Sequence, residues 1–175
     1  MEFLRIGEKL INPHRVHRAV EQILKLRSTG QSQQEVADQM GVDRTLVSRL
    51  ESLGEVRKGS RLALVGFPVA NKEEIEALAR QEGVEFVFVM TDRERWQFAE
   101  HRSGVDLANE LMVIFSELRD FDSVIFLGSD MRIKLVESIL EPGMVLSIEL
   151  GKSPMQEDVY VAPKMLQEAI RSLMG

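Results

Sequence analysis

SVIFLGS, residues 123–129, is a short run of β-branched, aromatic and small side chains without a single charge. Three other short segments are mainly apolar in the same way: RLALVGF at 61–67, VEFVFVM at 84–90 and MVLSIEL at 144–150. Continuous apolar strands, rather than alternating ones, are typical of a parallel sheet that is buried on both faces. The segment DVYVA at 158–162 predicts a fifth strand, at the edge of the sheet.

Helical patterns lie between these strands. They cover residues 72–81, 93–118 with a break at Ser103-Gly104, 132–140, and a last helix from Pro163 to about Met174. Strands that alternate with helices form right-handed βαβ units, which place helices on both faces of a parallel sheet. The predicted fold class is therefore α/β, and residues 60–175 are expected to form a small Rossmann-like domain.

Residues 13–54 carry apolar side chains at helical spacing and predict a module of three helices within residues 1–59. Pro13 and Gly30 bound the first helix, Ser32 and Glu35 are spaced as a capping box, and Asp43 caps the third helix, which ends at Gly54. The predicted core positions of the module are Val16, Val20, Ile23, Leu24, Leu26, Val36, Ala37, Met40, Leu46, Val47 and Leu50.

The net charge of -6 is divided unevenly along the 175 residues. Residues 1–60 hold ten Lys and Arg against eight Asp and Glu, a net of +2; residues 61–175 hold twelve against twenty, a net of -8. We expect the acidic excess to belong to the second domain, so that it does not argue against a polyanionic partner for the first.

The composition indicates the compartment in which the protein is expected. The chain has no cysteine, which excludes disulfides and thiol chemistry and is typical of a reducing compartment. The start MEFLRIGEKL carries acids and lacks a continuous apolar run, so it does not resemble a signal peptide, and no segment approaches the ~20 apolar residues of a membrane helix. We therefore expect a cytoplasmic protein that does not enter a membrane.

SQQEVADQMGVDRTLVSRLE, residues 32–51, resembles the helix-turn-helix of Xre-type, phage-repressor-like transcriptional regulators. The match rests on Gln33, on a small Ala37 where two helices cross, on Gly41 in the turn, and on recognition-helix positions. Those positions are Val47, Ser48, Leu50 and Glu51. Xre-type domains usually continue with two further helices, whereas this chain turns to strand at Arg61, so partition-protein-like and sigma-factor-like minimal modules remain alternatives.

The resemblance implies that the third helix enters the major groove of double-stranded DNA. Its outward residues, predicted to contact bases, are Arg44, Thr45, Ser48 and Arg49. The predicted phosphate contacts are Gln33, Arg15, Arg18, Lys25, Arg27, Arg57 and Lys58. One recognition helix covers only a few base pairs, so the chain is expected to act as a homodimer on two half-sites.

A parallel sheet binds ligands outside the carboxyl ends of its strands. The polar side chains that follow the four strands, and so predict a crevice for a small effector, are Asn71, Thr91, Asp92, Ser129, Asp130, Lys152 and Ser153. Two of them also have the spacing of capping boxes, Asn71 with Glu74 and Thr91 with Glu94.

Enzyme motifs are not apparent. GKS at 151–153 lacks the earlier glycine of a phosphate-binding loop, because Leu146 occupies that position, and no dinucleotide or nucleophile-elbow motif occurs. His101 is the single histidine of the second domain. We expect no enzyme, cofactor or metal, but a sequence-specific DNA-binding transcriptional regulator whose α/β domain dimerises. The alternatives are an enzyme of unknown chemistry with a DNA-binding head, and a partition-like or protein-interaction adaptor.

Overall fold

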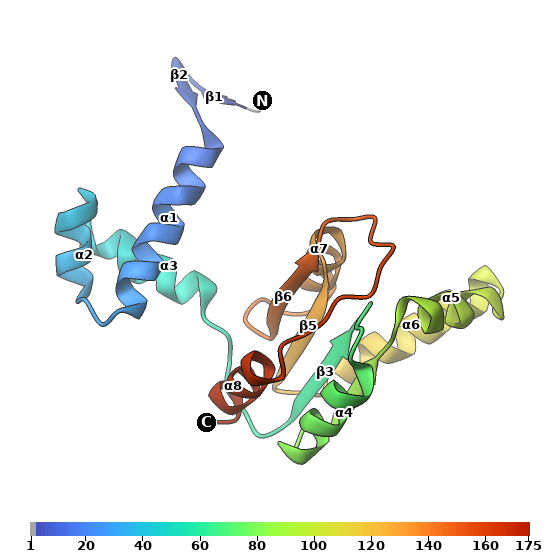
Figure 1. Cartoon of the computed structure of the whole chain (residues 1–175). Helices are drawn as coiled ribbons and strands as arrows, with labels where there is room; N and C mark the ends of the chain where they lie inside the picture. Colours follow the sequence, from blue (N-terminus) through green and yellow to red (C-terminus); the bar gives the residue numbers. More distant parts are fainter. Residues whose placement is uncertain (1–2) are drawn as a thin grey trace. The chain divides into compact units, whose positions relative to one another are not determined.

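The structure is a computed structural model, and it describes residues 3–175. The chain divides into two compact units, Met1–Glu55 and Val56–Gly175 (Figure 1). The sequence prediction placed the boundary after residue 59. Residues 56–59 pack with the second unit because the Arg57 N–H donates to the Gly143 carbonyl (2.7 Å) and the Gly59 N–H to the Leu173 carbonyl (3.0 Å).

The first unit begins with an antiparallel hairpin of β1 (Leu4–Ile6) and β2 (Lys9–Ile11), which the sequence analysis did not anticipate. Three helices follow: α1 (Pro13–Ser28), α2 (Gln33–Met40) and α3 (Arg44–Gly54). The capping box at the start of α2 is formed in both directions, and Asp43 caps α3. Gly41 closes α2 at φ 64°, in the left-handed region that glycine adopts most readily.

The three helices share a small core of four buried side chains: Ile23, Val36, Ala37 and Val47. The predictions for Val16, Leu24 and Leu46 are wrong, because these side chains are 52%, 40% and 44% exposed. Leu46 is turned by about 100° from the fully buried Val47, so it lies at the margin of the apolar side of α3 and not at its centre. The short α2 also covers too little of α1 to bury Val16 or Leu24.

The second unit contains a parallel sheet of four strands in the order β4-β3-β5-β6. Their bounds are β3 (Leu62–Gly66), β4 (Phe86–Val89), β5 (Ser123–Ser129) and β6 (Val145–Gly151). Every residue of β5, the SVIFLGS segment, is buried, as expected of a central strand with covered faces. The chain passes from β3 outward to β4 and then returns to the other side of β3, so the strand order reverses between β3 and β5.

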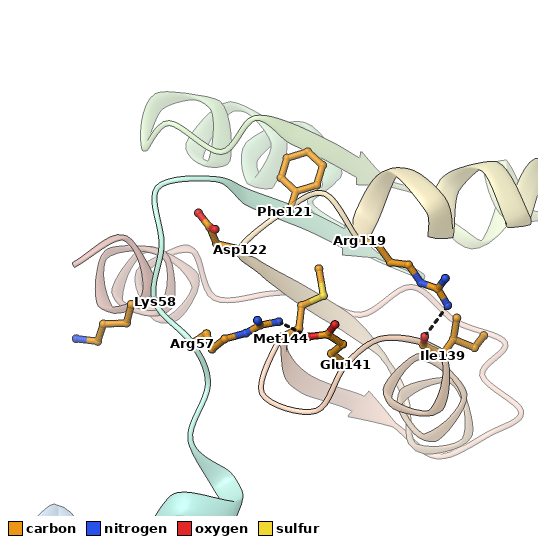
Figure 2. A pocket seen from close by; sticks show the side chains of 8 residues that line it. All are labelled: Arg57, Lys58, Arg119, Phe121, Asp122, Ile139, Glu141 and Met144. Carbon is orange, nitrogen blue, oxygen red and sulfur yellow. Dashed lines mark hydrogen bonds and ion pairs between the residues drawn. The ribbon is translucent and has the colours of Figure 1, made fainter.

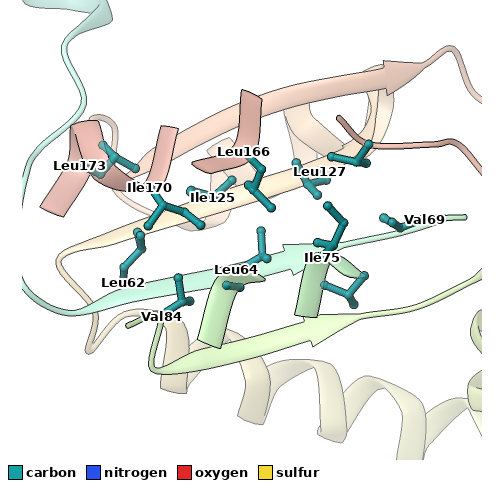
Figure 3. Close-up of a cluster of buried hydrophobic side chains, with 13 residues drawn as sticks. Leu62, Leu64, Val69, Ile75, Val84, Ile125, Leu127, Leu166, Ile170 and Leu173 are labelled. Carbon is teal, nitrogen blue, oxygen red and sulfur yellow. The ribbon is translucent and has the colours of Figure 1, made fainter. Parts of the chain in front are cut away.

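Helices cover both faces of this sheet, as predicted. On one face α4 (Lys72–Gln81) and α8 (Pro163–Met174) pack against Leu62, Leu64 and Ile125 (Figure 3). On the other face α6 (Gly104–Leu118) and α7 (Asp130–Ile139) pack against Ala63, Val65 and Phe126. The alternation of Leu62 and Leu64 with Ala63 and Val65 follows from the two-residue period of a strand.

The predicted break after the second strand is present. Helix α5 (Asp92–Glu100) ends before Ser103, whose side chain caps α6. The predicted fifth strand is wrong: residues 158–162 make only an isolated bridge, between Val69 and Val159. The Asn71 side chain instead holds the backbone of Val161, accepting from its N–H (2.9 Å) and donating to its carbonyl (2.9 Å).

Candidate functional site

The exposed side of α3 carries polar side chains that have no partner within the part of the chain that the structure describes. Val47 on the opposite side is fully buried, and it fixes the rotation of the helix. Within residues 3–175, no hydrogen bond or ion pair involves the side chains of Arg44, Thr45, Ser48 or Arg49. All four are exposed or half-buried.

Ser52 was missed by the sequence analysis, although it lies on the same side of α3. It follows Ser48 by four residues, so the two side chains stand one helical turn apart. Its hydroxyl donates to the Ser48 carbonyl at 3.1 Å. The signal that would have found it is the continuation of the i, i+4 spacing beyond the segment that matches Xre-type regulators.

Glu51 ties the three helices together. Its carboxylate accepts a hydrogen bond from Gln33 at the start of α2 (2.8 Å) and forms an ion pair with Arg27 of α1. Arg27 also donates to the Gln31 carbonyl. The hydrogen bonds from Arg27 and Gln33 lower the pKa of Glu51. Two predicted phosphate contacts, Gln33 and Arg27, are therefore engaged in orienting α3.

Two other acids of the helical unit are engaged in helix capping. Glu35 and Asp43 cap the amino ends of α2 and α3, and the capping hydrogen bonds lower the pKa of both carboxyls. Arg15, Arg18 and Lys25 of α1 are exposed, and the structure of residues 3–175 shows no side-chain partner for them. Arg15, Arg18 and Lys25 of α1 and the two arginines of α3 are thus available to bind an anion, whereas the carboxylates of Glu35 and Asp43 already accept hydrogen bonds.

The boundary at Glu55 changes the charge balance that the sequence suggested. Residues 1–55 hold eight Lys and Arg and eight Asp and Glu, a net of zero, because Arg57 and Lys58 belong to the second unit. Any attraction to a polyanion must therefore come from the distribution of charge over α1 and α3 and not from a net positive charge.

Four of the seven predicted crevice residues come together at the carboxyl ends of β5 and β6. The Ser153 hydroxyl donates to the Ser129 hydroxyl (2.7 Å), and the Ser153 N–H donates to Asp130 (2.9 Å). Lys152 Nζ lies 3.0 Å from Glu149 and 3.8 Å from Asp130. The backbone N–H of Ser153 lowers the pKa of Asp130, and the hydrogen bond to Glu149 raises the pKa of Lys152.

The other three predicted crevice residues have separate partners. Asn71 binds Val161 and does not cap α4, so its predicted capping box with Glu74 is wrong. Thr91 forms the predicted capping box with Glu94. The N–H of Asp92 donates to Asp158 (2.6 Å), and its carboxylate pairs with Arg95.

Arg132 was not among the predicted residues, although it follows β5 at the reversal of strand order. Its guanidinium lies 5.0 Å from the centre of the Phe67 ring. Its Nη1 atom is buried and has no hydrogen-bond partner among residues 3–175. Burial lowers the pKa of Arg132, and the charge of Arg95 acts in the same direction. Only the strand order, which the sequence does not give, makes the position of Arg132 distinctive.

The second unit also has two hollows, and Arg132 and Phe67 line the second of them. One, of about 460 Å³, is at the amino-terminal edge of the sheet and is lined by Arg57, Lys58, Arg119, Phe121, Asp122, Ile139, Glu141 and Met144 (Figure 2). Its charges are partly engaged: Arg57 lies 3.0 Å from Glu141, and Arg119 donates to the Ile139 carbonyl (3.2 Å). The other, an apolar groove of about 190 Å³, lies between α6 and α7. None of the seven predicted crevice residues lines either hollow.

Comparison of the chain with protein-family models, with curated proteins and with solved structures gives no match. Residues 3–175 contain no helix that is both long and apolar enough to cross a membrane. The same residues contain no group of three or more acidic or histidine side chains placed to hold a metal ion.

Proposed function

We propose that the protein is a sequence-specific DNA-binding transcriptional regulator in which α2 and α3 form a helix-turn-helix. The observation that carries the proposal is the unengaged face of α3: Arg44, Thr45, Ser48 and Arg49 have no partner within the described chain. Val47 anchors the helix in the core, and Glu51 links it to α1 and α2. Long cationic side chains on a rigidly held helix are suited to the major groove, where an arginine can bind a guanine through two hydrogen bonds.

Contacts to the DNA backbone would come from α1. Arg15, Arg18 and Lys25 follow each other at helical spacing, and none of them is neutralised by an ion pair among residues 3–175. Because α1 offers only these three cations to phosphates, we expect few phosphate contacts per chain and a moderate dependence of affinity on salt. A single chain would therefore bind weakly, and a homodimer on two half-sites accounts for specific recognition.

The experiment compares the wild-type protein with Arg44→Ala/Arg49→Ala in the selection of genomic fragments at about 150 mM salt. A matched control, Arg80→Ala/Arg93→Ala, removes the same charge from exposed positions of α4 and α5 in the second unit. Losing two bidentate base contacts should reduce the affinity for a selected fragment by about tenfold to a hundredfold per arginine, whereas the control should bind like the wild type. Equal binding by all three proteins would contradict the proposal.

A small-molecule effector is a second element of the proposed function, and Arg132 favours it. Ligands of open α/β sheets bind where the strand order reverses, which here is between β3 and β5. Arg132 lies at that point beside Phe67, with a buried Nη1 that lacks a partner in the described chain. A carboxylate or phosphate group would satisfy this guanidinium through charge-assisted hydrogen bonds.

The fluorescence of Trp96, the single tryptophan, provides a test of the effector. Its indole lies in α5, next to Arg95 at 5.3 Å, and Arg95 in turn acts electrostatically on Arg132. We expect anionic metabolites to shift the emission of the wild type and not of Arg132→Gln. A shift that persists unchanged in Arg132→Gln would place the ligand elsewhere.

The enzyme alternative is less well supported by the charged groups near the carboxyl ends of the strands. A general base at neutral pH needs a pKa close to the working pH. The pKa of Lys152 is raised by Glu149, and the pKa of Lys72 is raised by its 2.6 Å contact with Glu94, so both remain protonated. The pKa of Glu94 is lowered, since the hydrogen bonds from Lys72 and Thr91 together outweigh its burial.

A further inference from the structure

Helix α6 is far more apolar than its packing requires. It carries eight large apolar side chains, of which only Leu118 is buried: Val105, Leu107, Leu111, Met112, Val113, Ile114, Phe115 and Leu118. Val105 and Met112 are 70% and 71% exposed, and they lie on one side of the helix because seven residues separate them. A helix that is hydrophobic nearly all round is normally buried on more than one side.

The exposed apolar surface continues onto α7. Leu111 of α6 and Leu135 of α7 both line the apolar groove between these helices. Met131 lies one turn before Leu135, and the two side chains are 65% and 57% exposed. We call Val105, Leu111, Met112, Met131 and Leu135 the α6–α7 face.

The size of this face matches one side of a stable dimer. Its five side chains expose apolar surface on the order of 500 Å², within the range of the largest apolar patch on a typical monomer, and such patches are often binding sites. A standard interface buries ~800 Å² on each partner, of which ~55–65% is apolar. The α6–α7 face therefore supplies about the apolar area that such an interface needs, and polar atoms around it would supply the rest.

The charges around the face allow two identical copies to meet. The residues adjacent to Met112 and one turn away on either side are uncharged: Ala108, Asn109, Leu111, Val113, Phe115 and Ser116. Glu110, two residues before Met112, is already paired with Arg102 of the same chain, and Arg102 also stacks 4.1 Å from the Phe98 ring. A two-fold axis brings each residue near its own copy, so an uncharged centre avoids the repulsion of like charges.

We propose that the α6–α7 face binds the same face of a second copy of this chain, with the two α6 helices crossing near Met112. This inference deepens the proposed function and rests on it, since a regulator with one recognition helix per chain requires a second chain. The second unit thereby forms the dimer, which leaves α3 of both chains free to contact DNA. Methionine side chains such as Met112 and Met131 adapt readily to a symmetric contact.

The first measurement is sedimentation of the full chain over a range of concentrations. Met112→Lys introduces a charge into the centre of the face and should weaken self-association at least tenfold. The control is Met165→Lys on α8, which covers the opposite side of the sheet and is 38% exposed; it should dimerise like the wild type. Equal thermal unfolding of the two variants as monomers excludes a folding defect as the cause.

The second measurement uses the absence of cysteine from the sequence. Met112→Cys should form a disulfide-linked dimer upon mild oxidation, whereas Met165→Cys should remain monomeric in a denaturing gel. A wild type that is monomeric at high concentration, or a dimer unaffected by Met112→Lys and not cross-linked through Met112→Cys, would overturn the proposal.

Binding of selected DNA by the same proteins separates this inference from the proposed function. A dimer that uses another surface and still binds DNA would overturn only the α6–α7 interface. A dimer cross-linked through Met112→Cys that selects no DNA would overturn the proposed function and leave the interface standing.

Discussion

Gln33 Nε2 lies 2.8 Å from Glu51 Oε2, and this hydrogen bond joins the first turn of α2 to the second half of α3. The other carboxylate oxygen of Glu51 pairs with Arg27, so that one side chain links all three helices of the first unit. The rotation of α3, and with it the direction of Arg44 and Arg49, therefore depends on a carboxylate that lies outside the small apolar core.

Acid should loosen the helical unit through Glu51. Its pKa is lowered in the folded protein from the ordinary value of 4.5, first by the hydrogen bond from Arg27 and then by that from Gln33. A carboxyl with a lowered pKa contributes stability that is present above its unfolded pKa and is lost as the pH falls through the folded one. We expect the protection of α2 and α3 against hydrogen exchange, taken relative to the intrinsic exchange rate at each pH, to decrease as the pH falls below about 4.5.

The variant Glu51→Ala provides the comparison. It should exchange faster than the wild type at neutral pH, and its exchange in α2 and α3, corrected for the intrinsic rate, should depend less on acid. Glu35 and Asp43 also have lowered pKa values from capping hydrogen bonds, so part of the acid effect should remain. An acid response equal to that of the wild type would show that Glu51 does not join the helices.

Replacing each of two glycines of the helical unit by alanine should change the stability of the unit in opposite directions. Gly41 has φ 64°, and a β-carbon there would meet nothing within 4 Å, so the cost of Gly41→Ala is conformational and about 1–2 kcal/mol. Gly54 ends α3 without a positive φ and also has open space around it, so Gly54→Ala should stabilise the unit by about 0.5 kcal/mol. Helix unfolding followed by circular dichroism measures both, and a stabilised Gly41→Ala would contradict the assigned turn.

Substitution of Asn71 should lower the stability of the second unit and leave ligand binding unchanged. In Asn71→Ala the buried residue Val161 loses the partners of its N–H and its carbonyl, which costs about 1–3 kcal/mol. Asn71→Asp keeps the acceptor for the Val161 N–H and should recover part of this loss. Denaturant unfolding followed by Trp96 fluorescence gives the values. A fully stable Asn71→Ala would show that residues 158–162 are held by other contacts.

The spacing of apolar residues in the sequence correctly predicted most of the strands and helices of the second unit. Segments such as 123–129 and 72–81 form the predicted strand and helix, because burial on both faces and helix capping leave local patterns. The strand order could not be predicted, since it depends on packing between distant segments. The fifth strand failed for a related reason: the Asn71 side chain replaces the partners that a neighbouring strand would have supplied to Val161.

The sequence indicated which residues belong to the candidate site on α3, but it did not show which of the predicted residues are paired within the protein. Helical spacing located Arg44, Thr45, Ser48 and Arg49 on α3, but it placed Leu46 in the core, where a small three-helix unit has no room for it. Spacing also could not show that Gln33 and Arg27 are engaged by Glu51, or that Arg57 and Lys58 pack with the second unit. Arg132 required the strand order, because only the reversal between β3 and β5 makes its position distinctive.

The central claim, that α3 recognises DNA in a homodimer, is tested most directly by a footprint of the wild-type protein on a fragment that it selects from genomic DNA. We predict two protected half-sites whose centres are about 34 Å, or one helical turn, or a small multiple of that distance apart. The protection should be lost in Arg44→Ala/Arg49→Ala and retained in Arg80→Ala/Arg93→Ala. Selection of no fragment above non-specific binding, or a footprint that the Arg44 and Arg49 substitutions leave unchanged, would contradict the account.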